Sequence, residues 1–249
     1  MNIYVCISNV PDTTTRIKYK EGNKEVDYSG VQWIINPWDE LALTRALELK
    51  ESNAGVIEKV VTVTVGKADT EPTIRKALAV GADEAIRVDA NPEDALTTAT
   101  YLAGALESEP CDIIMCGVES SDFNSWSVGG MLAELMELPS VSGVSSLNID
   151  NGKPLVTREI DGGKQQLSTS TPAVFIVQKG IAIIPRIPSM RGIMTARTKP
   201  LKIIVGASAS PVVKINDYKA PPQKGSCKMI DVEHLEQLPE LLHTEARVI

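Results

Sequence analysis

The clearest chemical signal is the polar stretch GVESSDFNSWSVGG, residues 117–130. It follows the apolar run DIIMCG and leads into a helical pattern, so it connects a buried strand to a helix start. Free backbone N–H groups and the positive end of a helix dipole make such a connection a site for phosphate groups. Five polar side chains could add contacts to a pyrophosphate: Ser121, Asp122, Asn124, Ser125 and Ser127. The alternative is a plain helix start, capped by one of its Ser or Asp residues.

A second candidate segment is Asn36-Pro37-Trp38-Asp39, directly before the pattern of a long helix. Asn36 as the cap and Pro37 in the first turn would account for these residues structurally. Asn36 and the nearby backbone could also surround an adenine ring, and the two roles are compatible. Trp126 could stack on a ring or pack in the core. Cys6, at the end of the first apolar run, suits packing better than reactivity.

The segment IAIIPRIPSMRGIMTARTKP, residues 181–200, has the composition of a docking loop. Its apolar residues and prolines lead to Met190, and a basic stretch with Arg191, Arg197 and Lys199 follows. Apolar anchors beside positive charge could dock a partner protein. The alternative is a plain connecting loop over the sheet.

Few side chains are suited to covalent catalysis. The two histidines, His234 and His243, both lie in the last sixteen residues, and the four cysteines show no paired metal spacing. Neither motif GxxxxGK[ST] nor GxGxxG is present. The absence of a visible nucleophile–base pair disfavours a conventional hydrolase or transferase.

Composition narrows the class of protein further. The 249 residues are 43% hydrophobic and 23% charged, as in ordinary soluble proteins. The net charge of −7 argues against binding to a nucleic-acid backbone. The sequence contains no run of eighteen apolar residues, which argues against a membrane span, and the start MNIYVCISNV does not have the pattern of a signal peptide. We therefore expect a cytoplasmic protein with reduced cysteines.

Alternating strand and helix patterns must position these segments. Apolar runs predict strands over 2–8, 58–66, 84–88 and 112–117. Spacings of three and four predict helices over 38–50, 71–80, 92–108 and about 124–137, the second capped by Thr70. The alternation predicts an α/β fold with a doubly wound, mostly parallel sheet. Ligands bind such a sheet beyond the carboxyl ends of its strands, which here are the segments 6–12, 65–66 and 117–126.

Other patterns interrupt the alternation. Residues 17–32 suggest a surface hairpin around Gly22-Asn23, and residues from about 144 alternate as antiparallel strands do. Further strands are expected over 173–178 and 201–206. From Lys214 onward a Pro- and Lys-rich stretch leads to a short helix, which predicts a domain over 1–213 and an extended arm over 214–249.

These segments together resemble the beta subunit of electron transfer flavoproteins, with bacterial Fix-type and bifurcating members as the nearest kind. The resemblance runs from the N-terminus to about residue 205. Its markers are VCISNVPDT, INPWDELALTRALELKE, VGKADTEPTIRKALAVGADEAIRV, DIIMCGVESSDFNSWSVGGMLAELMELP, TREIDGG and IPSMRGIMTARTKP.

The resemblance implies a Rossmann-like, adenine-nucleotide-binding subunit in a heterodimer. An alpha subunit would carry FAD and be wrapped by the C-terminal arm, and this subunit would hold a second FAD or, alternatively, AMP. With FAD, electrons from NADH would divide between ferredoxin and the alpha flavin, which serves an acyl-CoA dehydrogenase or enoyl-CoA reductase. This reaction is electron bifurcation, and we favour FAD because the resemblance is to anaerobic bacterial members.

The resemblance also assigns residues. Carried onto this chain, the nucleotide site falls at Cys6, Asn36, Pro37, Trp38, Asp39, Val65, Gly66, Gly117, Val118, Glu119, Ser120, Ser121, Asp122, Phe123, Asn124, Ser125, Trp126, Ser127 and Val128. The partner-recognition loop maps onto 185–195, with Met190 as the apolar anchor and Arg191 beside it. Where many members have an AIDGDTAQVG-like stretch, this chain has SSDFNSWSVG, in which Phe123 and Trp126 are bulkier than the common residues.

A different class of function is a regulatory module of the same fold that binds AMP or ATP and has no redox role. Such a sensor has no need of the segment 181–200 or of the arm. The colour of the purified complex separates the two hypotheses, because a flavoprotein is yellow.

Overall fold

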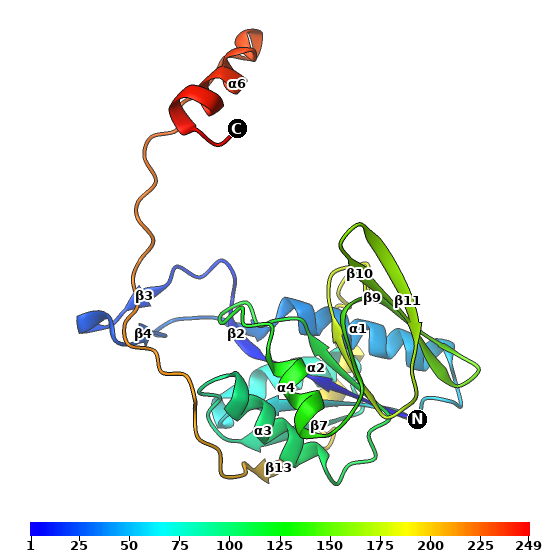
Figure 1. Cartoon of the computed structure of the whole chain (residues 1–249). Helices are drawn as coiled ribbons and strands as arrows, with labels where there is room; N and C mark the ends of the chain where they lie inside the picture. Colours follow the sequence, from blue (N-terminus) through cyan, green and yellow to red (C-terminus); the bar gives the residue numbers. More distant parts are fainter. The chain divides into compact units, whose positions relative to one another are not determined.

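Nine strands form one sheet in the computed structural model, which describes residues 1–249 (Figure 1). The strand order is β11-β10-β9-β12-β8-β1-β6-β7-β13. All neighbours from β9 to β13 in this order are parallel, whereas β10 pairs antiparallel with β9 and with β11. The strands are β1 Asn2–Cys6, β6 Lys59–Val65, β7 Glu84–Asp89, β8 Ile113–Gly117, β9 Ser140–Asp150, β10 Lys153–Ile160, β11 Gly163–Ser168, β12 Ala173–Val177 and β13 Leu201–Val205. The predicted mostly parallel α/β sheet with antiparallel additions is confirmed.

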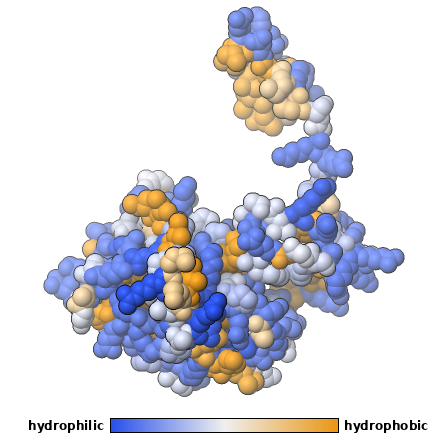
Figure 2. Space-filling model, turned by 180° about the vertical axis from the view of Figure 1, so that it is seen from behind, coloured by the Kyte–Doolittle hydropathy of each residue, from blue (hydrophilic) through white to orange (hydrophobic).

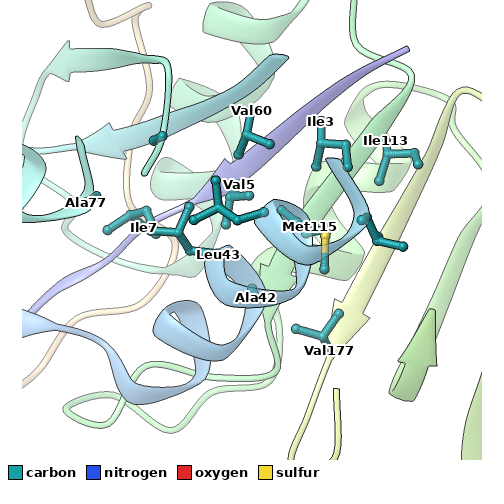
Figure 3. Packing of buried hydrophobic residues seen from close by; sticks show 14 of the residues in the cluster. Ile3, Val5, Ile7, Ala42, Leu43, Val60, Ala77, Ile113, Met115 and Val177 are labelled. Carbon is teal, nitrogen blue, oxygen red and sulfur yellow. The ribbon is translucent and has the colours of Figure 1, made fainter. Parts of the chain in front are cut away.

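Helices cover both faces of the sheet. One apolar core contains Ala42 and Leu43 of α1 together with Ile74 of α2, and the other contains Leu102 of α3 and Leu132 of α4. Figure 3 shows the first core, where α1 lies over the strands. The α-helices between residues 37 and 196 are α1 Pro37–Ser52, α2 Glu71–Val80, α3 Ala95–Leu106, α4 Val128–Leu135 and α5 Met190–Ala196, and a 3-10 turn η2 lies at Ala68–Thr70. None of the helices is both long and apolar enough to cross a membrane.

Burial from both sides explains why the central strands are continuous apolar runs. In β1, Ile3 and Val5 belong to one core, and Tyr4 and Cys6 belong to the other. Successive side chains of a strand point to opposite faces, so a strand covered on both faces has no polar alternation.

The order of the central strands creates a switch point between β1 and β8. From β1 the chain adds β6 and then β7 on one side, and it returns to place β8 on the other side of β1. The two strands run parallel, with Val5 opposite Met115. A crevice opens at the carboxyl ends of strands where the order reverses in this way.

The chain divides into two compact units, Met1–Lys18 with Asp27–Ile215 and Tyr19–Val26 with Asn216–Ile249. In the smaller unit, the rings of Tyr19 and Tyr218 stack with centroids 5.8 Å apart, and the amide of Tyr218 donates to the carbonyl of Asn23 at 2.8 Å. The strands β3 Lys18–Tyr19 and β4 Val26–Asp27 form a two-stranded sheet around the turn η1 Glu21–Asn23, which confirms the predicted hairpin. Outside the large sheet there are also β2 Asn9–Pro11 paired with β5 Trp33–Ile35, the 3-10 turn η3 Val232–His234, the helix α6 Gln237–Leu241 and the π-turn η4 Leu242–Ala246.

The predicted N-cap positions of two helices are confirmed, but capping by their side chains is not. Thr70 and Asn36 precede α2 and α1, but neither side chain caps its helix. The Thr70 hydroxyl instead donates to the carbonyl of Lys67 at 2.7 Å and closes the preceding turn. The third helix begins at Ala95 rather than at residue 92, because Asp94 forms a capping box with Thr97.

Candidate nucleotide-binding site

A cavity of about 410 Å³ lies at the switch point of the sheet. It is bounded by the ends of β1, β6 and β8, the start of α3, the loop before α4 and the chain after β13. Of the predicted site residues it is lined by Cys6, Asp39, Val65, Gly117, Val118, Glu119, Ser120, Asp122, Phe123, Ser125, Ser127 and Val128. Its volume is within the range of about 300–1,000 Å³ that is typical of small-molecule sites.

Other predicted residues lie beside the cavity. Trp38 and Trp126 line a second, more open pocket of about 430 Å³, which shares Val118 and Glu119 with the cavity. The predicted residues that line neither space are Asn36, Pro37, Gly66, Ser121 and Asn124.

Asp39 joins the two strand ends that form the floor of the cavity. Its carboxylate accepts the backbone N–H of Ser8, after β1, at 2.8 Å and that of Gly117, at the end of β8, at 3.1 Å. The side chain lies in the first turn of α1, so one buried residue connects helix and both strands. Burial raises the pKa of Asp39 from 3.8 to about 7, although the hydrogen bonds from Ser8 and Gly117 act in the opposite direction.

Asn36 holds the loop that follows β8. It is fully buried, its amide nitrogen donates to the carbonyl of Glu119 at 2.8 Å, and its amide oxygen accepts the N–H of Ser121 at 3.1 Å. The amide nitrogen and the amide oxygen of Asn36 therefore both form hydrogen bonds to the loop that follows β8. Asn36 shapes the cavity without lining it.

The amino end of α4 opens into the cavity. Its first helical hydrogen bond runs from the amide of Met131 to the carbonyl of Ser127 at 3.0 Å. Ser127 does not cap the helix, because its hydroxyl donates to the carbonyl of Ser125 at 2.6 Å. The simple capped start that the sequence also allowed is thus not formed, and the preceding amides are available to an anion. The helix begins at Val128, later than predicted, because Asn124 and Trp126 adopt left-handed backbone conformations.

Because the side chains around the cavity are acidic, the backbone amides before and at the start of α4 are important for binding a phosphate group. Neither lysine nor arginine is among the lining residues, whereas five acidic residues are: Asp39, Glu93, Asp94, Glu119 and Asp122. A phosphate group here must be stabilised by backbone N–H groups, hydroxyls and the dipole of α4 rather than by a basic side chain.

Two cysteines meet at the floor of the cavity. Cys6 is the last residue of β1, Cys116 is the next-to-last residue of the neighbouring strand β8, and both are buried in the same core. A hydrogen bond with Cys116, together with burial, raises the pKa of the Cys6 thiol well above its usual value. A thiol held protonated is a poor nucleophile, so these residues are suited to packing.

Several lining residues were missed by the sequence analysis. They include Pro92 to Leu96 after β7, and Val212, Val213 and Ile215 near the end of the larger unit. The strand-end rule applied to the third strand would have indicated the first group. The second group was obscured by the Pro- and Lys-rich composition around it.

The predicted docking loop exposes an apolar surface. Ile183, Ile187 and Met190 are 95%, 84% and 77% exposed, and Arg191 is exposed too. Its base is fixed by Arg186, whose guanidinium forms two hydrogen bonds to the carboxylate of Glu51 at 2.7 and 2.8 Å. Figure 2 shows apolar surface beside hydrophilic surface on the face that Figure 1 hides. Exposed apolar patches of this kind mark interaction surfaces.

The fold defines an α/β protein of the doubly wound class with a cavity at its switch point, and comparison with known proteins specifies its family. The electron transfer flavoprotein domain matches residues 25–208. The chain is 37% identical to the electron transfer flavoprotein subunit beta of Syntrophomonas wolfei, over 94% of this chain and 91% of the relative. It is 32% identical to the subunit beta of Bacillus subtilis over the whole of both chains, and 30% identical to that of Homo sapiens over 100% and 99%. The chain belongs to the electron transfer flavoprotein family and within it to the beta subunits.

Proposed function

We propose that this chain is the beta subunit of a heterodimeric electron transfer flavoprotein that holds FAD in the cavity at the switch point, with AMP as the alternative occupant. In the complex, electrons from NADH would divide between ferredoxin and the flavin of the alpha subunit. An acyl-CoA dehydrogenase or enoyl-CoA reductase would exchange electrons with the alpha flavin. The chain thus acts as the electron-transfer subunit of an oxidoreductase complex.

The observation that carries the proposal is the uncapped amino end of α4 in a cavity at the sheet's switch point. Ser127 leaves the first amides of α4 available, and Ser125 and Asp122 line the same space. Backbone amides at a helix start are suited to a phosphate or pyrophosphate. The bound flavin supplies the redox chemistry, and the residues of this chain supply its position and surroundings.

The second pocket favours FAD over AMP. It adjoins the cavity, because Val118 and Glu119 line both spaces, and Trp38 and Trp126 offer it aromatic surface. An adenylate that fills the cavity has no further ring to place there, whereas FAD does. Trp126 is 59% exposed and its backbone is left-handed, a conformation that is rare for bulky residues and that clusters at active sites and ligand clamps.

The docking loop and the arm account for the proposed partners. Met190 and Arg191 are exposed on the fixed base formed by Arg186 and Glu51, as an anchor and a charge for a partner protein would be. The smaller unit, Asn216–Ile249 with Tyr19–Val26, exposes apolar residues such as Met229 and Val232. We assign the loop to the dehydrogenase or reductase and the arm, residues 214–249, to the alpha subunit.

The nucleotide content of the complex co-expressed with its alpha subunit tests the proposal. Two FAD per heterodimer support FAD here and bifurcation from NADH. One FAD with one AMP makes this chain a structural subunit of a simple electron carrier. A colourless complex that holds only AMP or ATP contradicts the redox role and supports the regulatory module.

Asp122→Ala tests the location of the site. We expect this variant to retain less nucleotide through purification, because Asp122 lines the cavity beside the start of α4. Asp161→Ala is the matched control, since Asp161 is an exposed aspartate in the turn between β10 and β11. Equal nucleotide content in the two variants and the wild type would count against the assigned site.

A further inference from the structure

A short segment after β13 closes one side of the cavity. We call residues 207–215 the strap. It has no regular secondary structure, yet Val212, Val213 and Ile215 line the cavity. The chain approaches Ala90 closely just before the strap, because a Cβ atom at Gly206 would lie 2.8 Å from the Cβ of Ala90.

One carboxylate holds the strap in place. Oδ2 of Asp94 accepts the backbone N–H of Val212 at 2.7 Å and that of Val213 at 3.1 Å. Oδ1 of the same residue accepts the amide of Thr97 at 2.8 Å and caps α3. Asp94 is 9% exposed and forms no ion pair with a basic side chain. Its negative charge is therefore stabilised chiefly by backbone N–H groups.

This arrangement distinguishes the two helix starts at the cavity. The amino end of α3 is already filled by the carboxylate of Asp94, whereas that of α4 has no cap. An incoming phosphate is repelled from the first and stabilised at the second. A nucleotide with its phosphate at α4 places its other end toward α3 and the apolar side chains of the strap, which suit the face of a base or a ribose.

From this juxtaposition we infer that Asp94 is a positioning residue that latches the strap against the nucleotide, so that opening the latch precedes nucleotide release. The inference rests on the proposed function, because it takes an adenine nucleotide as the occupant. It assigns Asp94 a role in retaining the nucleotide, although Asp94 does not contact the phosphate. The hydrogen bonds from Thr97, Val212 and Val213 lower the pKa of Asp94 to about 2, so the latch remains ionised at neutral pH.

Two variants open the latch from opposite sides. Asp94→Asn keeps the shape of the side chain but replaces one acceptor oxygen by an NH2 group, which cannot accept both the cap and the strap amides. Val212→Pro removes the N–H that donates at 2.7 Å and leaves Asp94 and α3 unchanged. Thr97→Val is the matched control, because it removes the hydroxyl that accepts the amide of Asp94 at 3.0 Å without touching the strap.

The measurement is the release rate of bound nucleotide from the complex with the alpha subunit. Exchange is followed with radiolabelled AMP and, in a parallel sample, with radiolabelled FAD; exchange at the alpha subunit is common to all variants. We expect about tenfold faster release from Asp94→Asn and from Val212→Pro, the effect of losing one charge-assisted hydrogen bond. Thr97→Val should remain within about twofold of the wild type.

The possible outcomes distinguish failure of the latch from failure of the proposed function. Release at the wild-type rate from both latch variants overturns the latch and leaves the proposed function intact. Faster release from Thr97→Val and Asp94→Asn, with Val212→Pro at the wild-type rate, assigns the effect to helix α3 and also overturns the latch. Faster release from Val212→Pro supports the latch, because this variant removes a strap amide and leaves the cap of α3 in place. A wild-type complex that binds neither AMP nor a second FAD overturns the proposed function and the latch together. Thermal unfolding of each variant shows whether Asp94→Asn is folded, and Val212→Pro carries the test if it is not.

Discussion

Gly117 and Asp39 determine each other's place at the floor of the cavity. The amide of Gly117 donates to the Asp39 carboxylate at 3.1 Å, and a Cβ atom at residue 117 would lie 2.7 Å from the Cβ of Trp38 and closer still to that carboxylate. Because Asp39 also accepts the amide of Ser8, a change at residue 117 reaches both strand ends that flank the cavity. The absence of a side chain at 117 is therefore a condition for the geometry of the site.

Gly117→Ala should displace Asp39 and widen the floor of the cavity. We expect a loss of stability of about 1–3 kcal/mol, as for other overpacked sites, and lower nucleotide content after purification. Gly163→Ala is the matched control, because nothing lies within 4 Å of a Cβ atom at that position in β11, far from the residues that line the cavity. Denaturant unfolding and nucleotide analysis of both variants provide the comparison. Equal nucleotide retention by the two alanine variants would argue against a role of this contact in the site.

The raised pKa of Asp39 predicts a pH dependence of stability. The folded protein keeps a proton on Asp39 up to about pH 7, whereas the unfolded chain loses it near 3.8. The folded state thus binds more protons between these values, and this group's contribution to the free energy of unfolding falls as pH rises from about 4 to about 7 and is constant above that. The effect is on the order of a few kcal/mol.

Asp39→Asn should remove this contribution. Asparagine does not ionise, so the difference in unfolding free energy between the variant and the wild type should itself vary across the window from about pH 4 to about 7. Denaturant titrations at several pH values measure it. A difference that is constant across the window would show that Asp39 titrates at its ordinary value in the folded protein.

The sheet was predictable because its central strands are buried on both faces. Runs such as residues 2–8 and 112–117 carry no polar alternation, and only a parallel sheet covered by helices buries them fully. The same reasoning indicated the segments after β1, β6 and β8, which do meet at one cavity.

Contacts between distant segments could not be predicted in the same way. The meeting of Asp94 with Val212 joins residues 118 positions apart, and nothing local to either residue indicates it. The stacking of Tyr19 on Tyr218 places the hairpin in the same unit as the tail, which their separate compositions do not suggest. The role of Asn36 was also not visible, because an asparagine before a proline-started helix equally suits a cap.

Trp126→Ala should distinguish a flavin from an adenylate in the site. Trp126 lines the second pocket, not the cavity, so its loss should weaken FAD binding and leave AMP binding nearly unchanged. Loss of one aromatic stacking partner costs about 1–3 kcal/mol, which corresponds to roughly fivefold to a hundredfold weaker binding. Titrations with FAD and with AMP, followed by tryptophan fluorescence and by equilibrium dialysis, measure the two affinities.

Trp33→Ala is the control for that experiment. Trp33 is partly exposed on β5 and packs against Tyr28, and it lines neither the cavity nor the second pocket. It should leave both affinities unchanged. If Trp126→Ala weakens AMP and FAD to the same extent, the tryptophan acts through the loop before α4, and the second pocket does not hold a flavin ring.

Met190→Ala should slow electron delivery to the partner dehydrogenase or reductase while the nucleotide stays bound. Met190 is 77% exposed and begins α5, whose Ser189 cap accepts the amide of Gly192 at 3.0 Å, so truncation removes apolar contact without disturbing the helix start. An anchor in the centre of an interface contributes more than about 1 kcal/mol to binding, which predicts a loss of at least fivefold in the transfer rate at limiting partner concentration.

Ile160→Ala is the control, because Ile160 is a comparably apolar residue, 47% exposed, at the end of β10. A transfer rate that responds equally to both substitutions would assign docking to another surface, whereas a loss confined to Met190→Ala, with unchanged nucleotide content, places the partner on the loop.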